Sequence, residues 1–246
     1  MILNDYENYS TQQLNSVELD NITIQNGSAE EGAGVYNINT NLTISNCVFN
    51  GNSSSNNGGA IYNAYGDLII ARCSFTGNVS DYGGAIYNTA ADTEISNCVF
   101  YSNHADYGGA IYFFSSTGSS SPKIQNCTFY NNKASGYDGY YPYGEGGAIF
   151  NNGQILLFTN CTFYKNTSKS LGGAIDSFAG VLNITNCTFC DNSSGAAAEI
   201  YGPNCKLIMK NSIVWGNNGG SEIAVGSESE LSRSVIKDGY KGKGNS

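Results

Sequence analysis

The stretch NCVFNGNSSSNNGGAIYN, at residues 46–63, contains two short blocks that recur along the chain. Relatives of the first block, NCVFNGN, begin at residues 46, 72, 97, 126, 160 and 186, with a degenerate copy, NSIVWGN, at 211–217. Relatives of the second block, GGAIYN, begin at residues 58, 83, 108, 146 and 172, with weaker forms at 32–37 and 197–202. Short repeats of this kind are typical of a solenoid, in which each repeat stacks on its neighbours.

Each repeat contains three short strand-like pieces, which in the first full copy are residues 42–44, 47–49 and 59–62. Leu42 and Ile44, then Cys47 and Phe49, alternate with other residues, as in strands with one buried face. A coil of three strands that stacks on the next coil at roughly 4.8 Å is a parallel β-helix. We therefore predict an all-β parallel β-helix of about eight to nine rungs.

In such a stack, each repeated position predicts a column of side chains. Three columns are expected inside: Cys47, Cys73, Cys98, Cys127, Cys161 and Cys187; Phe49, Phe75, Phe100, Phe129, Phe163 and Phe189; Ile61, Ile86, Ile111, Ile149 and Ile175. Tyr62, Tyr87, Tyr112 and Phe150 are expected to stack outside. The last asparagine of each first block, from Asn52 to Asn217, is expected in a turn, where asparagine tolerates left-handed backbone and forms hydrogen-bonded ladders.

Composition and charge exclude several classes of protein. With 40% hydrophobic residues the chain is not disordered, and no apolar run reaches the roughly 18 residues of a membrane helix. Met1 to Ser10 lacks the basic and apolar regions of a signal peptide. The net charge is −9 and the basic residues are scattered, which argues against a nucleic-acid partner.

The alternation of Phe-x-x-Asn with Gly-Gly-Ala-Ile resembles the repeats of the chlamydial polymorphic outer membrane proteins over about residues 17–236. It is also similar to adhesin-like β-helix proteins of methanogens and gut bacteria. The resemblance implies a right-handed, single-stranded β-helix at the cell surface or outside the cell. It further implies a passenger or stalk that displays loops for binding a host protein or glycan and is exported and anchored by parts outside this segment.

The repeat also predicts the organisation of the chain. Residues 1–16 are expected to form an N-terminal segment or cap, residues 17–236 the β-helix, and residues 237–246 a flexible tail. Because a β-helix exposes strand edges at its ends, end-to-end self-association into fibres is an alternative function.

The strongest candidate for a binding site is the insertion KASGYDGYYPYGE at residues 133–145, which widens the interval between two cysteines to 34 residues. It carries Tyr137, Tyr140, Tyr141 and Tyr143, more aromatic surface than a turn requires. Tyrosine offers a flat apolar face with a polar tip, which suits protein contacts or sugar rings. A loop that simply packs on the flank of the solenoid is the alternative.

No cofactor is expected, with calcium as a weak possibility. Asp81 and Asp106 each stand two residues before a Gly-Gly pair, so they are expected on adjacent rungs with Asn56 beneath. Two carboxylates one rung apart either turn into water or hold a cation between them.

Two cysteines outside the column suggest a disulfide bond. Cys190 and Cys205 depart from the repeat and are candidates for a surface disulfide, whereas thiols in the column are too far apart for one.

Catalytic groups are scarce in the sequence. The lone histidine, His104, has no serine or cysteine at a fixed interval and is expected to be a solvated turn residue. We therefore predict a protein that is not an enzyme. The alternative is a polysaccharide lyase or glycoside hydrolase on the same scaffold, which would need several carboxylates and a basic residue on one flank.

Overall fold

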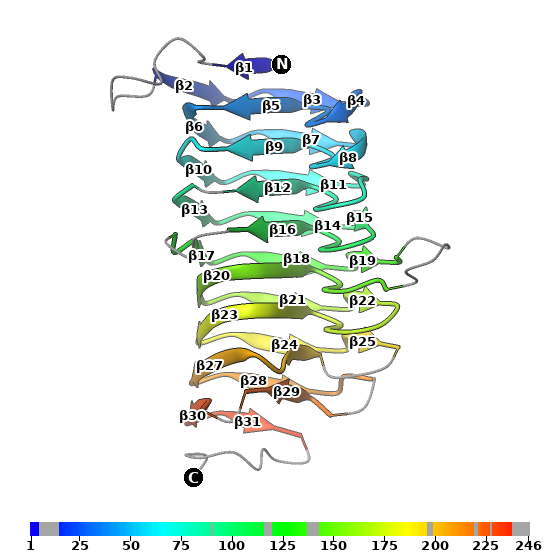
Figure 1. The fold of residues 1–246 in the computed structure, drawn as a ribbon, viewed down its shortest axis with the longest axis vertical. Coiled ribbons are helices and arrows are strands. Elements are labelled where there is room, and N and C mark those ends of the chain that lie inside the picture. The colour runs from blue at the N-terminus through cyan, green and yellow to red at the C-terminus, as the bar shows by residue number, and fades with distance from the viewer. Residues whose placement is uncertain are drawn as a thin grey trace.

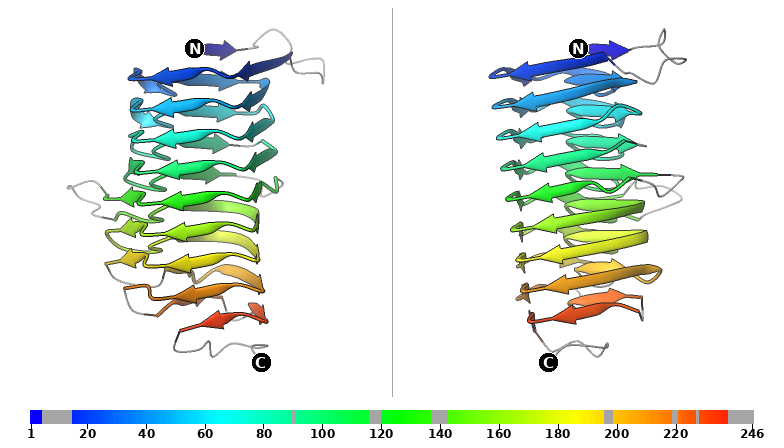
Figure 2. Two further views of the ribbon diagram at one scale, coloured as in Figure 1. Left: turned by 180° about the vertical axis from the view of Figure 1, so that it is seen from behind. Right: turned by 90° about the vertical axis from the view of Figure 1, so that its left-hand side faces the viewer.

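The computed structural model describes residues 1–4, 15–89, 91–115, 120–136, 143–195, 199–218, 221–226 and 228–237. These residues form strands and turns and contain no α-helix, and so no helix that is long and apolar enough to cross a membrane. The strands stack as rungs along one axis, with β1 at one end and β31 at the other (Figures 1 and 2). The chain is an all-β parallel solenoid of about eight turns, as the repeat predicts.

The largest sheet has 16 strands within the described residues, and it contains two stacks that meet where a strand bends from one stack into the other. The first stack follows the Gly-Gly-Ala-Ile blocks and contains β1 (Ile2–Asn4), β5 (Val35–Ile38), β9 (Ile61–Ala64), β12 (Ile86–Thr89), β16 (Ile111–Phe114), β26 (Ile200–Gly202) and β29 (Ile223–Val225). The second precedes the cysteines and contains β2 (Asn15–Asp20), β6 (Thr40–Ser45), β10 (Leu68–Ala71), β13 (Thr93–Ser96), β17 (Lys123–Gln125), β27 (Cys205–Lys210) and β30 (Glu230–Ser232). Two long strands, β20 (Ile149–Thr159) and β23 (Ile175–Thr185), run through both.

The other sheets are narrower. The second sheet contains β3 (Thr23–Gln25), β7 (Val48–Asn50), β11 (Ser74–Thr76), β14 (Val99–Tyr101), β18 (Thr128–Tyr130), β21 (Thr162–Tyr164), β24 (Thr188–Cys190), β28 (Ile213–Trp215) and β31 (Val235–Ile236). The third contains β15 (His104–Ala105), β19 (Lys133–Ala134), β22 (Thr167–Ser168) and β25 (Ser193–Ser194). At the N-terminal end β4 (Ser28–Glu31) pairs with β8 (Ser53–Asn57).

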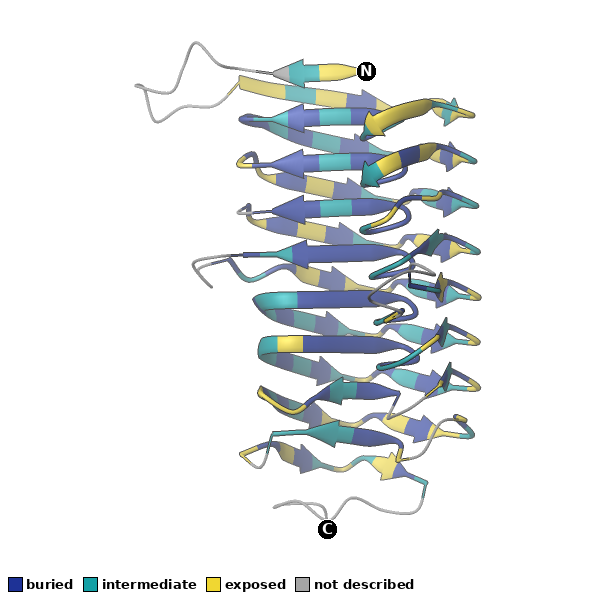
Figure 3. Cartoon of the chain, turned by 45° about the vertical axis from the view of Figure 1, so that its right-hand side comes forward, coloured by how far each residue is buried: buried dark blue, intermediate teal, exposed yellow. Residues whose placement is uncertain are grey.

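The predicted columns are confirmed. The phenylalanines are fully buried, and their rings stack with centroids 4.6–4.8 Å apart. The column cysteines are buried free thiols. Tyr62, Tyr87, Tyr112 and Phe150 stack outside the Ile column at 5.1–5.4 Å, although Tyr112 and Phe150 are themselves largely covered. Figure 3 shows the buried and exposed positions alternating along the strands.

The asparagine ladder is confirmed in its hydrogen bonds but not in its backbone. Asn103 illustrates the pattern: its amide N–H bonds Oδ1 of Asn132 at 3.0 Å, and its side chain donates to the Phe75 carbonyl at 3.0 Å. The left-handed residue is the one just before the ladder asparagine, for example Ser102 with φ 53°. The ladder side chain points inward and donates to a buried carbonyl, and the residue before it adopts the left-handed backbone of the turn.

The ends of the chain are only partly described. Ile2–Asn4 forms β1, which pairs with β5, whereas residues 5–14 and 238–246 lie outside the described residues. The predicted N-terminal cap and C-terminal tail therefore stay predictions.

Candidate binding site

The third sheet forms a narrow polar flank. His104, Lys133, Thr167 and Ser193 are register partners on successive rungs and point outward, whereas Ala105, Ala134, Ser168 and Ser194 point inward and are buried. Strand pairing thus places one polar side chain per rung on this flank.

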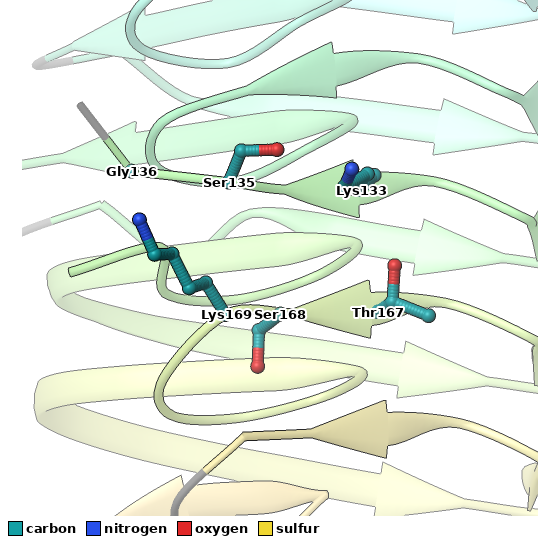
Figure 4. A pocket seen from close by; sticks show the side chains of 6 residues that line it. All are labelled: Lys133, Ser135, Gly136, Thr167, Ser168 and Lys169. Atoms are coloured by element: carbon teal, nitrogen blue, oxygen red, sulfur yellow. The ribbon is translucent and has the colours of Figure 1, made fainter. Parts of the chain in front are cut away.

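An open pocket of about 420 Å³ lies on this flank, across two consecutive rungs. It is lined by Lys133, Ser135, Gly136, Thr167, Ser168 and Lys169. Figure 4 shows the side chain of Lys169 reaching toward the rung of Gly136, with the Thr167 hydroxyl below Lys133. Two ammonium groups and the hydroxyls of Ser135 and Thr167 therefore surround one hollow, whereas the Ser168 hydroxyl is buried. These donors suit an anionic or hydroxyl-rich ligand.

The pocket lies at the base of the predicted binding insertion. Gly136 has φ +65°, and a Cβ there would lie 2.5 Å from the Tyr143 carbonyl carbon, so the two ends of the insertion are pressed together. Ser170 N–H also donates to the Gly144 carbonyl at 2.8 Å. Tyr137, Tyr140 and Tyr141 lie outside the described residues, and the described Tyr143 is exposed.

His104 differs from the expectation of a solvated turn residue. It lies in β15, is half-buried, and its Nε2 is 2.7 Å from Ser135 Oγ on the next rung. Burial and the nearby Lys133 lower the pKa of His104. The contact joins residues 31 positions apart at the start of an insertion. Because this interval does not recur in the repeat, the sequence did not indicate the contact.

Asp81 and Asp106 lie on adjacent rungs, because Asp106 N–H donates to the Asp81 carbonyl at 2.9 Å, and Asp81 N–H donates to Asn56. The register of β15 with β19 places Ser135 after Asp106 in this column. The register of β19 with β22 places Lys169 after Ser135. The flank therefore changes from acidic to basic along the axis. Burial raises the pKa of Asp81, although its side chain is largely exposed.

A second pair of carboxylates, which the sequence did not single out, lies at the end of the insertion. Tyr107 packs edge to face on Phe150 of the next rung. Glu145 is the register partner of Tyr107, and Asp176 is that of Phe150, in each case one rung further along the axis. Burial raises the pKa of Glu145, and burial followed by Glu145 raises that of Asp176 well above its usual value. Asp176 is only 3% exposed, and its Oδ2 has no hydrogen-bond partner. Asp176 interrupts a column of aromatic residues, and this exception is the signal in the sequence that could have indicated the pair.

The predicted disulfide between Cys190 and Cys205 is not formed, since both are free thiols. Cys190 lies on the outer side of β24, next to the inward Phe189, whereas Cys205 is buried at the start of β27 in another sheet. The chain enters β27 with Cys205 and Leu207 both turned into the core, so the thiol faces away from the surface.

No group of three or more His, Cys, Asp or Glu side chains in the described part of the chain is arranged to hold a metal ion. The proposed sites at Asp81 and Asp106 and at the tyrosines stay predictions.

The stacked parallel rungs and inward columns define the class of protein as a parallel β-helix repeat protein. The sequence model of the family described as "Right handed beta helix region" matches residues 8–140 and 114–236, and the chain belongs to this family. No curated protein and no solved structure matches the chain. The family includes both non-enzymatic proteins and carbohydrate-active enzymes. The narrower resemblance to chlamydial surface proteins stays a prediction.

Proposed function

We propose that this protein is an adhesin-like binding domain, located outside the cell or on its surface, that holds an acidic glycan on the flank of its third sheet. The pocket at Lys133 and Lys169 is the observation that carries the proposal. It is open to solvent, it combines ammonium and hydroxyl groups, and it is presented by paired strands rather than by a loop alone. The extracellular location is supported by the resemblance of the repeats.

The shape of the site favours a glycan over a protein ligand. Sugars are bound through many hydroxyl contacts, and the outward column offers a hydroxyl or another polar group on each of four successive rungs. An extended saccharide chain parallel to the axis would meet Lys133, Thr167 and Ser193 in turn. The ammonium groups would favour sugars that carry a carboxylate or sulfate.

The proposal is tested by measuring the binding of uronate-containing and neutral polysaccharides to the purified chain and to a Lys133→Ala/Lys169→Ala variant. Loss of charged hydrogen bonds worth about 1.5–3 kcal/mol predicts at least roughly tenfold weaker binding of the acidic polymer. The matched control is Lys123→Ala/Lys206→Ala, which removes the same charge from two exposed lysines that pair with Glu94 and Glu230 on the large sheet.

Equal losses in the two variants would mean that binding follows net charge and not this site. If neither polymer binds, the adhesin proposal fails at this flank. A third variant, Tyr137→Ser/Tyr140→Ser/Tyr141→Ser, tests the tyrosines separately; unchanged binding would remove them from the site.

An enzyme remains the second candidate because Glu145 and Asp176 both have raised pKa values and lie among aromatic side chains. Glycoside hydrolysis uses such a pair of carboxyl groups. The burial of Asp176 argues against an enzyme, because a side chain that is 3% exposed offers little contact to a substrate. Release of reducing ends from a polysaccharide, abolished by Glu145→Gln, would favour the enzyme over the adhesin.

A further inference from the structure

The last rungs replace a small buried residue by glutamate twice in succession. The residue before the inward isoleucine is a fully buried alanine in five rungs: Ala60, Ala85, Ala110, Ala148 and Ala174. The next two rungs carry Glu199 and Glu222 at this position, where Ala174 N–H donates to the Glu199 carbonyl and Ile200 N–H to that of Glu222. Backbone register therefore places two carboxylates one rung apart inside the solenoid.

The carboxylate of Glu199 lies in space that is free only because residue 173 is glycine. A Cβ on Gly173 would collide with Glu199 Oε2, and it would lie 2.7 Å from the carbonyl carbon of Ser193. The carboxylate therefore lies against the segment Ser193–Ser194. Glu199 is 1% exposed, and no hydrogen bond of good geometry reaches its carboxylate oxygens, because the Ser194 backbone N–H that faces them donates to the Asn218 carbonyl at 2.9 Å. The buried Ser194 Oγ has no hydrogen-bond partner.

Glu222 supplies a second buried carboxylate. Its Oε2 accepts a hydrogen bond from Asn217 Nδ2 at 2.5 Å, which ties it to the end of the asparagine ladder. Burial, and then the neighbouring Glu222, raise the pKa of Glu199 to about 8, against the opposing effect of the Ser194 backbone amide. Buried charges in proteins are normally paired with an opposite charge or coordinate a metal ion, and two carboxylates on adjacent rungs repel each other.

We propose that Glu199 and Glu222, together with Ser194 Oγ, bind a calcium ion inside the last rungs of the β-helix. Carboxylate and hydroxyl oxygens are hard ligands, and Ca²⁺ accepts flexible oxygen coordination completed by carbonyl groups and water. The ion would neutralise the two charges and give a partner to the buried oxygens of Glu199 and Ser194. This site is separate from the pocket on the third sheet, and it does not depend on the binding function proposed for that pocket.

The test compares chelator-treated protein with and without added calcium, by calorimetric titration and by thermal unfolding. At a calcium concentration about a hundredfold above Kd, a single site that exists only in the folded state should raise Tm by roughly 5–10 °C. The decisive variant is Glu199→Ala/Glu222→Ala, which restores the alanine of the other rungs. It should fold without calcium and show no calcium heat and no Tm shift.

Glu230→Gln is the matched control, because Glu230 is an exposed carboxylate on β30 that pairs with Lys206. This variant should bind calcium as the parent chain does. Should the double alanine variant not fold, Glu222→Gln keeps the shape of the side chain and should weaken calcium binding at least tenfold. An unchanged Tm of the parent chain in calcium, or an equal shift in the double variant, would overturn the proposal and leave a protonated Glu199 as the explanation.

Discussion

The central rungs and the last two rungs share one backbone register but differ in the side chains that fill it. Phe100, Phe129 and Phe163 occupy the aromatic column in the middle, whereas Val214 and Ile236 continue it at the end. Ser212 and Ser234 likewise continue the cysteine column. Backbone pairing thus holds the coil together while its contents change, and two of the departures from the repeat, Asp176 and Glu199, bring a carboxylate into the buried interior.

The largest difference between the two regions is expected in the aromatic column. Phe100→Ala removes a fully buried ring that stacks on both neighbours at 4.8 Å, and such a change costs about 3–5 kcal/mol of unfolding free energy. Val214→Ala at the end of the column removes fewer atoms and should cost roughly half as much or less. Urea unfolding of both variants measures this; equal losses would mean that the end of the stack is as tightly packed as its middle.

The asparagine ladder should give the next largest effect. Asn103→Ala leaves the Asn78 amide and the Phe75 carbonyl without their partners inside the core. At about 1–3 kcal/mol for each orphaned group, a loss of about 3 kcal/mol is expected. Asn131→Gly is the matched control, because the Asn131 side chain bonds Ser102 at the surface and its left-handed backbone position is glycine in other rungs, at Gly51 and Gly77; it should cost less than about 1 kcal/mol. Similar losses in the two variants would argue that the inner ladder contributes no more than a surface bond.

These columns could be predicted from the sequence because each depends on a position that recurs with the same residue in most rungs. Cys73 and Phe75 need no other information to be placed above Cys47 and Phe49. The contact between His104 and Ser135 has no such support, since it occurs on one rung and follows from where an insertion begins.

The less regular features were missed for a similar reason. Cys205 stands two residues before the inward Leu207, so strand alternation places it inside, but Gly180 occupies its position on the previous rung and the repeat has no other cysteine there for comparison. Asp176 and Glu199 were visible as exceptions in their columns, but their burial depends on the residues of adjacent rungs, which a single repeat does not contain.

A smaller effect, visible in its pH dependence, is expected at Asp176. Because its pKa is raised in the folded state, Asp176 stays protonated there while the unfolded chain ionises above its usual value of 3.8. The unfolding free energy should therefore fall as the pH rises from about 4 toward the folded pKa. Asp176→Asn cannot ionise, so its stability relative to the parent chain should increase as the pH rises above about 4. Parallel curves of Tm against pH for the two proteins would show that Asp176 does not titrate above pH 4, and Asp67→Asn, at an exposed position, is the comparison.

The smallest loss of stability is expected in the cysteine column, where serine already replaces cysteine at the end of the molecule. Cys98→Ser places in the middle of the thiol column the residue that Ser212 provides at its end. Ser212 Oγ accepts from the Cys187 amide at 3.1 Å and donates to the Lys210 carbonyl at 2.8 Å, so a hydroxyl can replace the Cys98 thiol, which accepts from the Cys73 amide at 3.4 Å. The hydroxyl is smaller and more polar than the thiol but keeps its partners, and the loss should be about 1 kcal/mol or less. Cys98→Ala, which removes the acceptor for the Cys73 amide, should cost more; if the serine variant is the less stable of the two in urea, the column requires sulfur packing rather than a hydrogen-bond acceptor.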